Sequence, residues 1–321
     1  MQVWRRPVTR RGLVVGVGTV AVAIAGRSRA AHITPLVVEP ERGFGGNPLL
    51  ISVQSLRDML ASDPRPIQLL DASDLADYRS RHIAGAHHVW WQDTMELNAF
   101  WYGMVLKADD GAGHQGRRRD FLRHLNIDSR KPVVVYDDSH GYAAARVCWF
   151  LTFLGLSASV LDGGLRAWAG ADQKLTSDAP PTDQSAQSTV APQEGFYLFA
   201  DQIASRMNTG ADQVVDCRTA KERTTGDLQD LAIPGALTID RDQLLDSNGL
   251  LKDRAALSTL FSTAGIDPAR TQYLIGPTAI DCSLFWLGLR LWGATTVTLC
   301  DGGWGQWRDT SGLPLERTAG H

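Results

Sequence analysis

Thiols are the most reactive side chains in this sequence, and there are four of them: Cys148, Cys217, Cys282 and Cys300. Four cysteines in 321 residues are too few for a scaffold built on disulfides. No Cys-x-x-Cys or His-x-x-x-His spacing, which would be typical of a zinc site, occurs in the chain. We therefore expect no metal and no cofactor, and any chemistry should depend on a thiol and the groups around it.

Two further patterns suggest chemistry but have simpler structural explanations. Cys217 and Arg223 have the Cys-x-x-x-x-x-Arg spacing of cysteine-dependent phosphatases, yet no glycine lies between them to build a phosphate loop. His82, His87 and His88 could suggest a metal, but adjacent side chains point apart if the segment is a strand. We expect both patterns to be structural.

The composition is that of a globular protein with no global preference for polyanions. The chain is 44% hydrophobic and 21% charged, and its formal net charge is −3. A weakly negative chain has no basic field that would attract nucleic acid or acidic lipid. With 321 residues, it can hold two ordinary domains behind a short leader.

The first thirty-one residues are typical of an export signal. Paired arginines, Arg10 and Arg11, follow Thr9 and precede an apolar run over residues 13–25. A small-x-small pattern ends at Ala30, so residues 1–31 resemble a twin-arginine signal with a cleavage site. We predict an exported, periplasmic or extracytoplasmic protein. If the segment is not cleaved, it would instead serve as a membrane anchor.

An internal repeat defines the fold. Five features recur in the same order in the two halves. The first-half segments are, in order, Ile67–Asp71, Ile83–Ala86, Pro132–Tyr136, Phe153–Gly155 and Val160–Gly164. Their second-half counterparts are, in the same order, Gln213–Asp216, Ile233–Ala236, Tyr273–Ile275, Leu291–Gly293 and Thr298–Gly303. Trp168 and Trp307 follow at the same distance from the last feature, and we expect both to be core residues.

Continuous apolar strands that alternate with helical segments predict parallel sheets covered by helices on both faces. We therefore predict an α/β protein with two tandem domains, over residues 48–173 and 196–318. Residues 174–195 between them are rich in Pro, Ser, Thr, Asp and Gln, which is the composition of a linker.

These motifs resemble the rhodanese family, specifically its two-domain thiosulfate and mercaptopyruvate sulfurtransferases. The resemblance covers roughly residues 50–317 and rests on His82-Ile83-Ala84-Gly85-Ala86 and on the Asp-Gly-Gly-x-x-x-Trp ending of both halves. The second half also has the family's Asp-x-Arg start at Asp216 to Arg218. It departs from the family at Ala232, where a histidine is usual. The resemblance implies two tandem rhodanese-like domains.

In this family, a nucleophilic cysteine follows the central strand of the second domain. Backbone N–H groups and a helix N-terminus there stabilise the thiolate and the transferred sulfur. Alignment of the glycines at the helix ends puts Asp137 and Ile275 at the two cysteine positions, and a shift by one residue puts Gly276 there instead of Ile275. Neither alignment offers a thiol, and Pro277 removes one N–H donor.

By resemblance, the loop residues Gly276, Thr278, Ala279 and Ile280 would surround the sulfur-donor anion. Arg218 and Arg223 would face the same anion, since arginine suits bidentate contacts with sulfonates. The alternative is that the two arginines are salt-bridge partners of Asp or Glu.

Cys282 is the candidate for a substitute nucleophile, because it falls in the first turn or two of the helix after the loop. By resemblance, Cys217 and Cys300 end the strands that flank the central strand, so all three thiols fall near the carboxyl edge of the second sheet. The alternative is that they are buried small apolar residues. Whether any two of them form a disulfide stays open. Cys148 is expected in the first core.

Two functions follow from this sequence. The first is sulfur transfer from thiosulfate or 3-mercaptopyruvate to a thiol or cyanide, impaired or lost because the loop cysteine is missing. Its partners would be a small sulfur-containing anion and a thiol acceptor. The second is a non-catalytic rhodanese module that binds an anion or a partner protein in the cell envelope.

Overall fold

The computed structural model describes residues 42–62, 66–94, 112–138, 140–207, 210–225 and 231–317. The predicted signal segment, residues 1–31, lies outside the described residues. Among the helices that are described, none is long and apolar enough to cross a membrane.

The first sheet contains five parallel strands. Its spatial order is β1 (Leu50–Ile51), β5 (Ala158–Leu161), β4 (Val133–Tyr136), β2 (Gln68–Asp71) and β3 (Ala86–His88). The central strand β4 reads Val-Val-Val-Tyr and is buried along its whole length, as expected for a strand covered on both faces.

The second sheet repeats this order with five further parallel strands. They are β6 (Tyr197–Leu198), β11 (Val297–Cys300), β10 (Gln272–Ile275), β7 (Gln213–Asp216) and β9 (Leu237–Thr238). A small antiparallel pair, β8 (Leu231–Ala232) and β12 (Glu316–Arg317), lies outside this sheet. The prediction of two α/β domains with parallel sheets is confirmed.

Helices connect the strands in both domains. In the first they are α1 (Val53–Leu60), α2 (Leu75–Ser80), α3 (Ala112–His124), α4 (Tyr142–Phe153) and α5 (Gly164–Gly170), with the 3-10 turn η1 (Trp91–Thr94). In the second they are α6 (Ala200–Met207), α7 (Ala220–Thr224), α8 (Arg254–Thr263), α9 (Asp281–Trp292) and α10 (Gly303–Asp309), with the 3-10 turn η2 (Arg241–Leu244).

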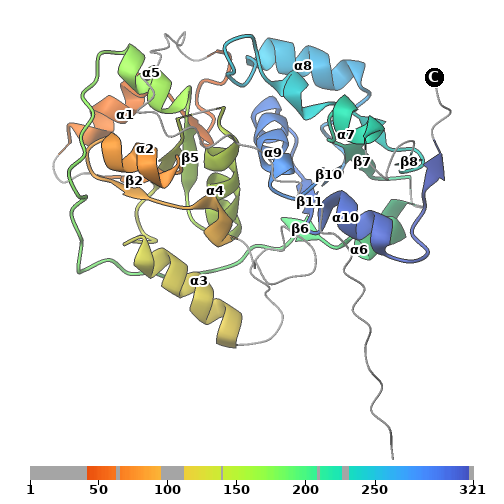
Figure 1. The fold of residues 1–321 in the computed structure, drawn as a ribbon, viewed down its shortest axis with the longest axis horizontal. Coiled ribbons are helices and arrows are strands. Elements are labelled where there is room, and N and C mark those ends of the chain that lie inside the picture. Colours follow the sequence, from red (N-terminus) through yellow and green to blue (C-terminus); the bar gives the residue numbers. More distant parts are fainter. Residues whose placement is uncertain are drawn as a thin grey trace, which may run out of the picture. The chain divides into compact units, whose positions relative to one another are not determined.

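Separate apolar clusters cover the two faces of each sheet. In the first domain, α1 and α5 lie to one side of β5 and α4 lies to the other (Figure 1). In the second, α6 and α10 cover one face, whereas α8 and α9 cover the other. Trp168 and Trp307 are both buried in these cores, as predicted.

The α4 face of the first domain and the α9 face of the second share one continuous core. The ring of Phe196 lies 6.0 Å from that of Trp149 on α4 and 6.2 Å from that of Trp286 on α9. Cys148 is fully buried in the same core, as expected. The two sheets are therefore packed against each other through helices α4 and α9.

The segment predicted as a linker, residues 174–195, contains no helix or strand of the described structure but is bonded to the first domain. The His82 N–H donates to the Thr176 carbonyl at 2.8 Å, and the Ala191 N–H donates to the Leu154 carbonyl at 3.0 Å. The ring nitrogens of His82 bond to the carbonyls of Tyr78 and Asp178, so this histidine is structural, as expected.

Candidate functional site

The ends of the central strands fix how the two halves correspond. The Ala72 N–H donates to the Tyr136 carbonyl at 2.8 Å, and in the second domain the Cys217 N–H donates to the Ile275 carbonyl at 2.8 Å. Tyr136 and Ile275 are therefore equivalent, and each is the last residue of its strand. The alignment that placed Ile275 opposite Asp137 is therefore wrong by one residue, because Ile275 is the last residue of β10 and is fully buried.

The next residue is the first of each loop. The Asp137 carbonyl accepts from the Leu165 N–H at 2.9 Å, and the Gly276 carbonyl accepts from the Trp304 N–H at 2.7 Å. Leu165 and Trp304 occupy the same place after the two Asp-Gly-Gly motifs. Asp137 and Gly276 are therefore the equivalent loop positions, which is the second alignment that the sequence allowed.

The first loop is closed by its own first side chain. The carboxylate of Asp137 accepts hydrogen bonds from the N–H groups of Gly141 and Ala144, each at 3.1 Å. These donors lie at the beginning of α4, where an anion is favoured by the free N–H groups and by the helix dipole. Asp137 itself is thus the anion held at this helix N-terminus.

The carboxyl group beside it feels this negative charge. Burial, together with repulsion from Asp137, Asp77 and Asp71, raises the pKa of Asp138 to about 6. The first loop is therefore an acidic environment, which disfavours a second anion.

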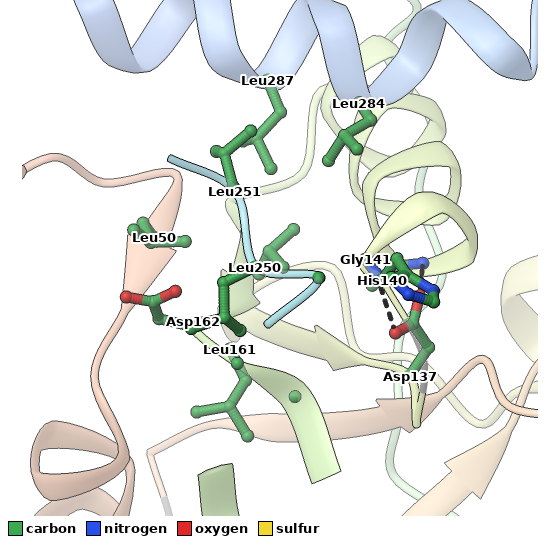
Figure 2. Close-up of a pocket in the computed structure, with 15 residues that line it drawn as sticks. Leu50, Asp137, His140, Gly141, Leu161, Asp162, Leu250, Leu251, Leu284 and Leu287 are labelled. Carbon is green, nitrogen blue, oxygen red and sulfur yellow. Dashed lines mark hydrogen bonds between the residues drawn. The ribbon is translucent and has the colours of Figure 1, made fainter. Parts of the chain in front are cut away.

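A small cavity lies next to this loop (Figure 2). Its volume is about 30 Å³, and its lining includes Asp137 and His140 from the loop and Leu250 from the second domain. One water molecule needs about 10–15 Å³ by the same measure, so this cavity admits a few water molecules beside the first loop.

In the second domain, a carboxylate from the helix closes the loop. The Asp281 carboxylate accepts from the N–H of Thr278 at 3.1 Å and from its hydroxyl at 2.7 Å. Pro277 has no N–H to offer. Asp281 is the first residue of α9, so it bends back over the turn where an exogenous anion would bind.

The rest of the second loop lies against the Asp-Gly-Gly motif or within the core. Gly276 and Ala279 are buried, whereas Thr278 and Ile280 are half-buried. Gly303 lies so close that a Cβ atom there would be only 2.8 Å from the Gly276 carbonyl oxygen. The loop is therefore tightly held by the segment that follows β11.

Cys282 follows Asp281 in the first turn of α9, as predicted. Its side chain is fully buried. A Cβ atom built on Gly276 would lie 2.8 Å from the Cys282 Sγ, so this thiol fills the space beside the empty loop position. All four cysteines of the chain are free thiols, and all four are buried.

The two arginines predicted to face an anion are engaged elsewhere. Arg218 is fully buried, donates to the Asp216 carboxylate at 2.7 Å, and lies 3.5 Å above the ring of Trp304. Arg223 donates from Nη1 to the Arg218 carbonyl oxygen. The ion pair of Arg218 with Asp216 matches the salt-bridge alternative, whereas the structure gives Arg223 a backbone partner.

Arg241 is a charged residue of this site that the sequence did not reveal. It donates from Nη2 to Glu222 at 2.7 Å, and its Nε lies 3.8 Å from Asp281. Burial raises the pKa of Asp281, and the positive charge of Arg241 opposes that shift. The guanidinium therefore helps to keep the Asp281 carboxylate ionised over the loop.

Comparison with known families decides the relationship of the chain. The model of the rhodanese-like domain matches it twice, over residues 52–171 and 199–310. The chain belongs to the rhodanese family.

Characterised members of the rhodanese family match most of the chain. The 3-mercaptopyruvate sulfurtransferase of Rattus norvegicus is 27% identical over 279 residues, which cover 80% of this chain and 91% of the rat protein. The sulfur carrier protein TtuD of Thermus thermophilus is 24% identical over 294 residues, which cover 86% of this chain and 99% of that protein. The chain is thus a sulfurtransferase-like member of the family.

Solved structures share the rhodanese fold. The 3-mercaptopyruvate sulfurtransferase SseA from Escherichia coli superposes with a TM-score of 0.67 at 21% identity, covering 79% of this chain and 98% of that one. The anaerobic ergothioneine biosynthesis enzyme from Chlorobium limicola gives 0.72 at 16% identity, covering 85% and 71%. At these identities the likeness concerns the fold.

Two residues of this rhodanese-family site that were not predicted could have been found in the sequence: Asp281, and Arg146, whose charge interacts with Cys282. Thr278 and Asp281 are three residues apart at a helix start, the spacing at which capping side chains reach the backbone. Arg146 is the one charged residue in the apolar helix α4, and it is fully buried. Arg241 carries no such signal, because it meets Asp281 only through the tertiary fold.

Proposed function

We propose that this chain is a non-catalytic member of the rhodanese family that does not transfer sulfur from thiosulfate or 3-mercaptopyruvate and serves as a binding module in the cell envelope. The observation that carries the proposal is the second loop. Its first position is Gly276, which has no side chain, and the carboxylate of Asp281 occupies the adjacent turn.

Sulfur transfer of this kind needs a thiolate to attack the donor and free N–H groups to stabilise the charge that develops. Gly276 supplies no sulfur, Pro277 supplies no N–H, and the Thr278 N–H already bonds to Asp281. A dianion such as thiosulfate would also be repelled by that carboxylate. Each requirement of the reaction is therefore weakened at the same place.

The arginines support the same proposal. A guanidinium held by a carboxylate is less available to an anion than a free one. Arg218 is buried against Asp216, and Arg241 is shared between Glu222 and Asp281. These ion pairs weaken the binding of a small sulfur-containing anion, although the Nη1 of Arg218 has no partner among the described residues.

A second candidate function is sulfur transfer by Cys282. It is favoured by one observation, the position of the Cys282 Sγ beside the empty side-chain position of Gly276. The family relatives handle sulfur, as their names state, so a sulfur-containing substrate and a thiol acceptor would be its partners. Against it stands the complete burial of Cys282.

Turnover assays of four proteins separate the two functions. Wild type, Cys282→Ala, Gly276→Cys and Gly276→Cys/Cys282→Ala are incubated with thiosulfate and cyanide, and thiocyanate is followed. Parallel reactions use 3-mercaptopyruvate with a thiol acceptor, and pyruvate is followed. The double variant is needed because a side chain at position 276 would collide with the Cys282 Sγ.

We expect no turnover by wild type or by Cys282→Ala, and slow but measurable turnover by the double variant, whose loop regains a thiol but keeps Pro277 and Asp281. Turnover by wild type that disappears in Cys282→Ala would overturn the proposal in favour of the second candidate. Binding to envelope proteins is tested separately by crosslinking in intact cells, with a variant lacking residues 1–31 as the control for export. An unexported full-length chain would contradict the envelope location.

A further inference from the structure

Two of the buried thiols meet on the same face of the second sheet. Cys217 follows the last residue of β7, and the strand register pairs Asp216 with Ile275, so Cys217 lies beside Gly276. The Cys282 Sγ lies 2.8 Å from the place where a Gly276 Cβ would stand. Since adjacent parallel strands are about 4.8 Å apart, the Cys217 and Cys282 side chains are brought together around the empty position.

The third thiol of the domain is excluded from this pair by its orientation. Cys217 and Cys282 belong to the core cluster on the α9 face of the sheet, whereas Cys300 belongs to the cluster on the opposite face. The Cys300 Sγ makes a contact of 3.8 Å to the Gly303 carbonyl oxygen on that face. Cys300 interacts with Cys282 through charge, but the sheet lies between their side chains.

The two thiols interact directly with each other. Burial, and next a hydrogen bond with Cys282, raises the pKa of Cys217 well above its ordinary value, so Cys217 is a neutral S–H donor. Cys282 lies in the first turn of α9, and its sulfur is the atom nearest to the empty position of Gly276.

A buried cation from the first domain also acts on Cys282. Arg146 is fully buried, and its Nε donates to the Thr94 hydroxyl at 2.9 Å. Its Nη1 has no hydrogen-bond partner among the described residues, and its charge interacts with Cys282 and Asp301. A buried positive charge that interacts with this pair stabilises the negative charge that develops on sulfur during thiol–disulfide exchange.

We propose that Cys217 and Cys282 form a redox pair that closes to a disulfide when the folded protein meets a small disulfide oxidant. The Cys282 thiolate attacks one sulfur of the oxidant and displaces the other as a thiolate, which gives a mixed disulfide. Cys217 then loses its proton, attacks the Cys282 sulfur and releases the second thiolate. Overall, two protein thiols are oxidised and one oxidant disulfide is reduced to two thiols.

Access to the pair requires a local opening of the first turn of α9, because both thiols are buried. The disulfide would join the end of β7 to the beginning of α9 and draw the Cys282 sulfur away from Gly276. The shape of the second loop would thus depend on the redox state of the pair.

The test uses the full-length folded protein and oxidised glutathione. After acid quenching and alkylation in denaturant, proteolysis and mass spectrometry show which cysteines are joined. We expect a peptide that links Cys217 with Cys282 and lacks two hydrogen atoms, with Cys148 and Cys300 alkylated. The oxidised protein should also have a thermal midpoint several degrees above that of the reduced protein.

Matched variants keep the result interpretable. Cys300→Ser and Cys148→Ser should retain the linked peptide, whereas Cys217→Ala and Cys282→Ala should lose it. A link to Cys300 would overturn the proposal. So would complete alkylation of Cys217 and Cys282 in wild type under conditions that join the same cysteines in the urea-unfolded chain, an outcome that does not depend on whether any variant folds.

Discussion

The first and second loops share one frame and differ in where their negative charge originates. In the first, the carboxylate comes from Asp137, the first loop residue, and reaches forward to the N–H groups of α4. In the second, that position is Gly276, and the carboxylate comes from Asp281 at the beginning of α9 and reaches back.

The difference shows two ways in which a chain can fill its own anion site. A strand, a turn and a helix N-terminus leave N–H groups that need an acceptor. In the first loop the acceptor is the side chain of the first loop residue, Asp137. In the second loop the acceptor is Asp281, and the first loop residue, Gly276, has no side chain. The second arrangement leaves space beside Gly276, which the Cys282 thiol fills.

The largest expected effect comes from the buried carboxylates at the ends of β2 and β7. Asp216 neutralises the buried guanidinium of Arg218, whereas Asp71 accepts from the Ser73 N–H at 2.9 Å and its pKa is raised by burial. Asp216→Asn should cost about 3–5 kcal/mol of unfolding free energy because it leaves a buried charge unpaired. Asp71→Asn should cost about 1 kcal/mol or less.

Urea denaturation of the two variants measures this difference. Equal losses of unfolding free energy would show that the buried charge of Arg218 does not depend on Asp216. The predicted difference between the ends of β2 and β7 would then be wrong.

The empty loop position gives the second effect. Gly276→Ala should lower the unfolding free energy by about 1–3 kcal/mol, because the added methyl group would lie 2.8 Å from the Cys282 Sγ. In a Cys282→Ala background, the same substitution should cost much less. A double-mutant cycle by urea denaturation checks the coupling. Additive effects would contradict the close approach of the two residues.

Removal of each loop carboxylate gives a smaller effect. Asp137→Ala should cost about 1–2 kcal/mol, since it deprives two N–H groups of α4 of their acceptor. Asp281→Ala should cost about half as much, because Thr278 is only half-buried and water can replace the carboxylate. Hydrogen exchange should accelerate at Ala144 in the first variant and at Thr278 in the second. Acceleration at neither amide would contradict the assigned bonds.

The smallest effect is a pH dependence confined to the first loop. The folded-state pKa of Asp138 is about 6, above its ordinary value of 3.8, so the folded protein holds this proton more tightly than the unfolded chain. Stability that is present below about pH 4 is therefore lost as the pH rises towards 6. Asp138→Asn should remove that loss and gain about 1 kcal/mol on wild type between pH 4 and 7, once solvent screening is allowed for.

Thermal or urea unfolding of wild type and Asp138→Asn across this pH range provides the measurement. The equivalent second-loop residue is Pro277, which does not titrate, so the effect should be absent there. A difference between wild type and variant that does not change with pH would exclude a raised pKa at Asp138.

The sequence predicted the sheets because their signals are local. Apolar strands that end at Asp71 and Asp216, and the fixed spacing to Trp168 and Trp307, define the same units in both halves. The first loop residue of the second domain was predicted one position too early, because the alignment was counted back from the glycines after α4 and α9. Gly155 lies one residue further past its helix than Gly293, so the count placed Ile275 where Gly276 belongs.

The charged contacts of the site were harder to predict. Arg241 and Asp281 are forty residues apart in the chain, and only the fold brings them within 3.8 Å. Arg146 interacts through its charge with Asp301 and Cys282 of the other domain, which no local pattern indicates. Cys282 was found from its place at a helix start, but its burial depends on how α9 packs against the core.

The most direct measurement is the intact mass of the wild-type protein after incubation with thiosulfate, followed by removal of excess donor. We predict no added sulfur on wild type and one added sulfur atom on Gly276→Cys/Cys282→Ala, located on the introduced cysteine by peptide mapping. Wild-type protein that gains a sulfur atom on Cys282 would contradict the conclusion that the second loop has no working nucleophile.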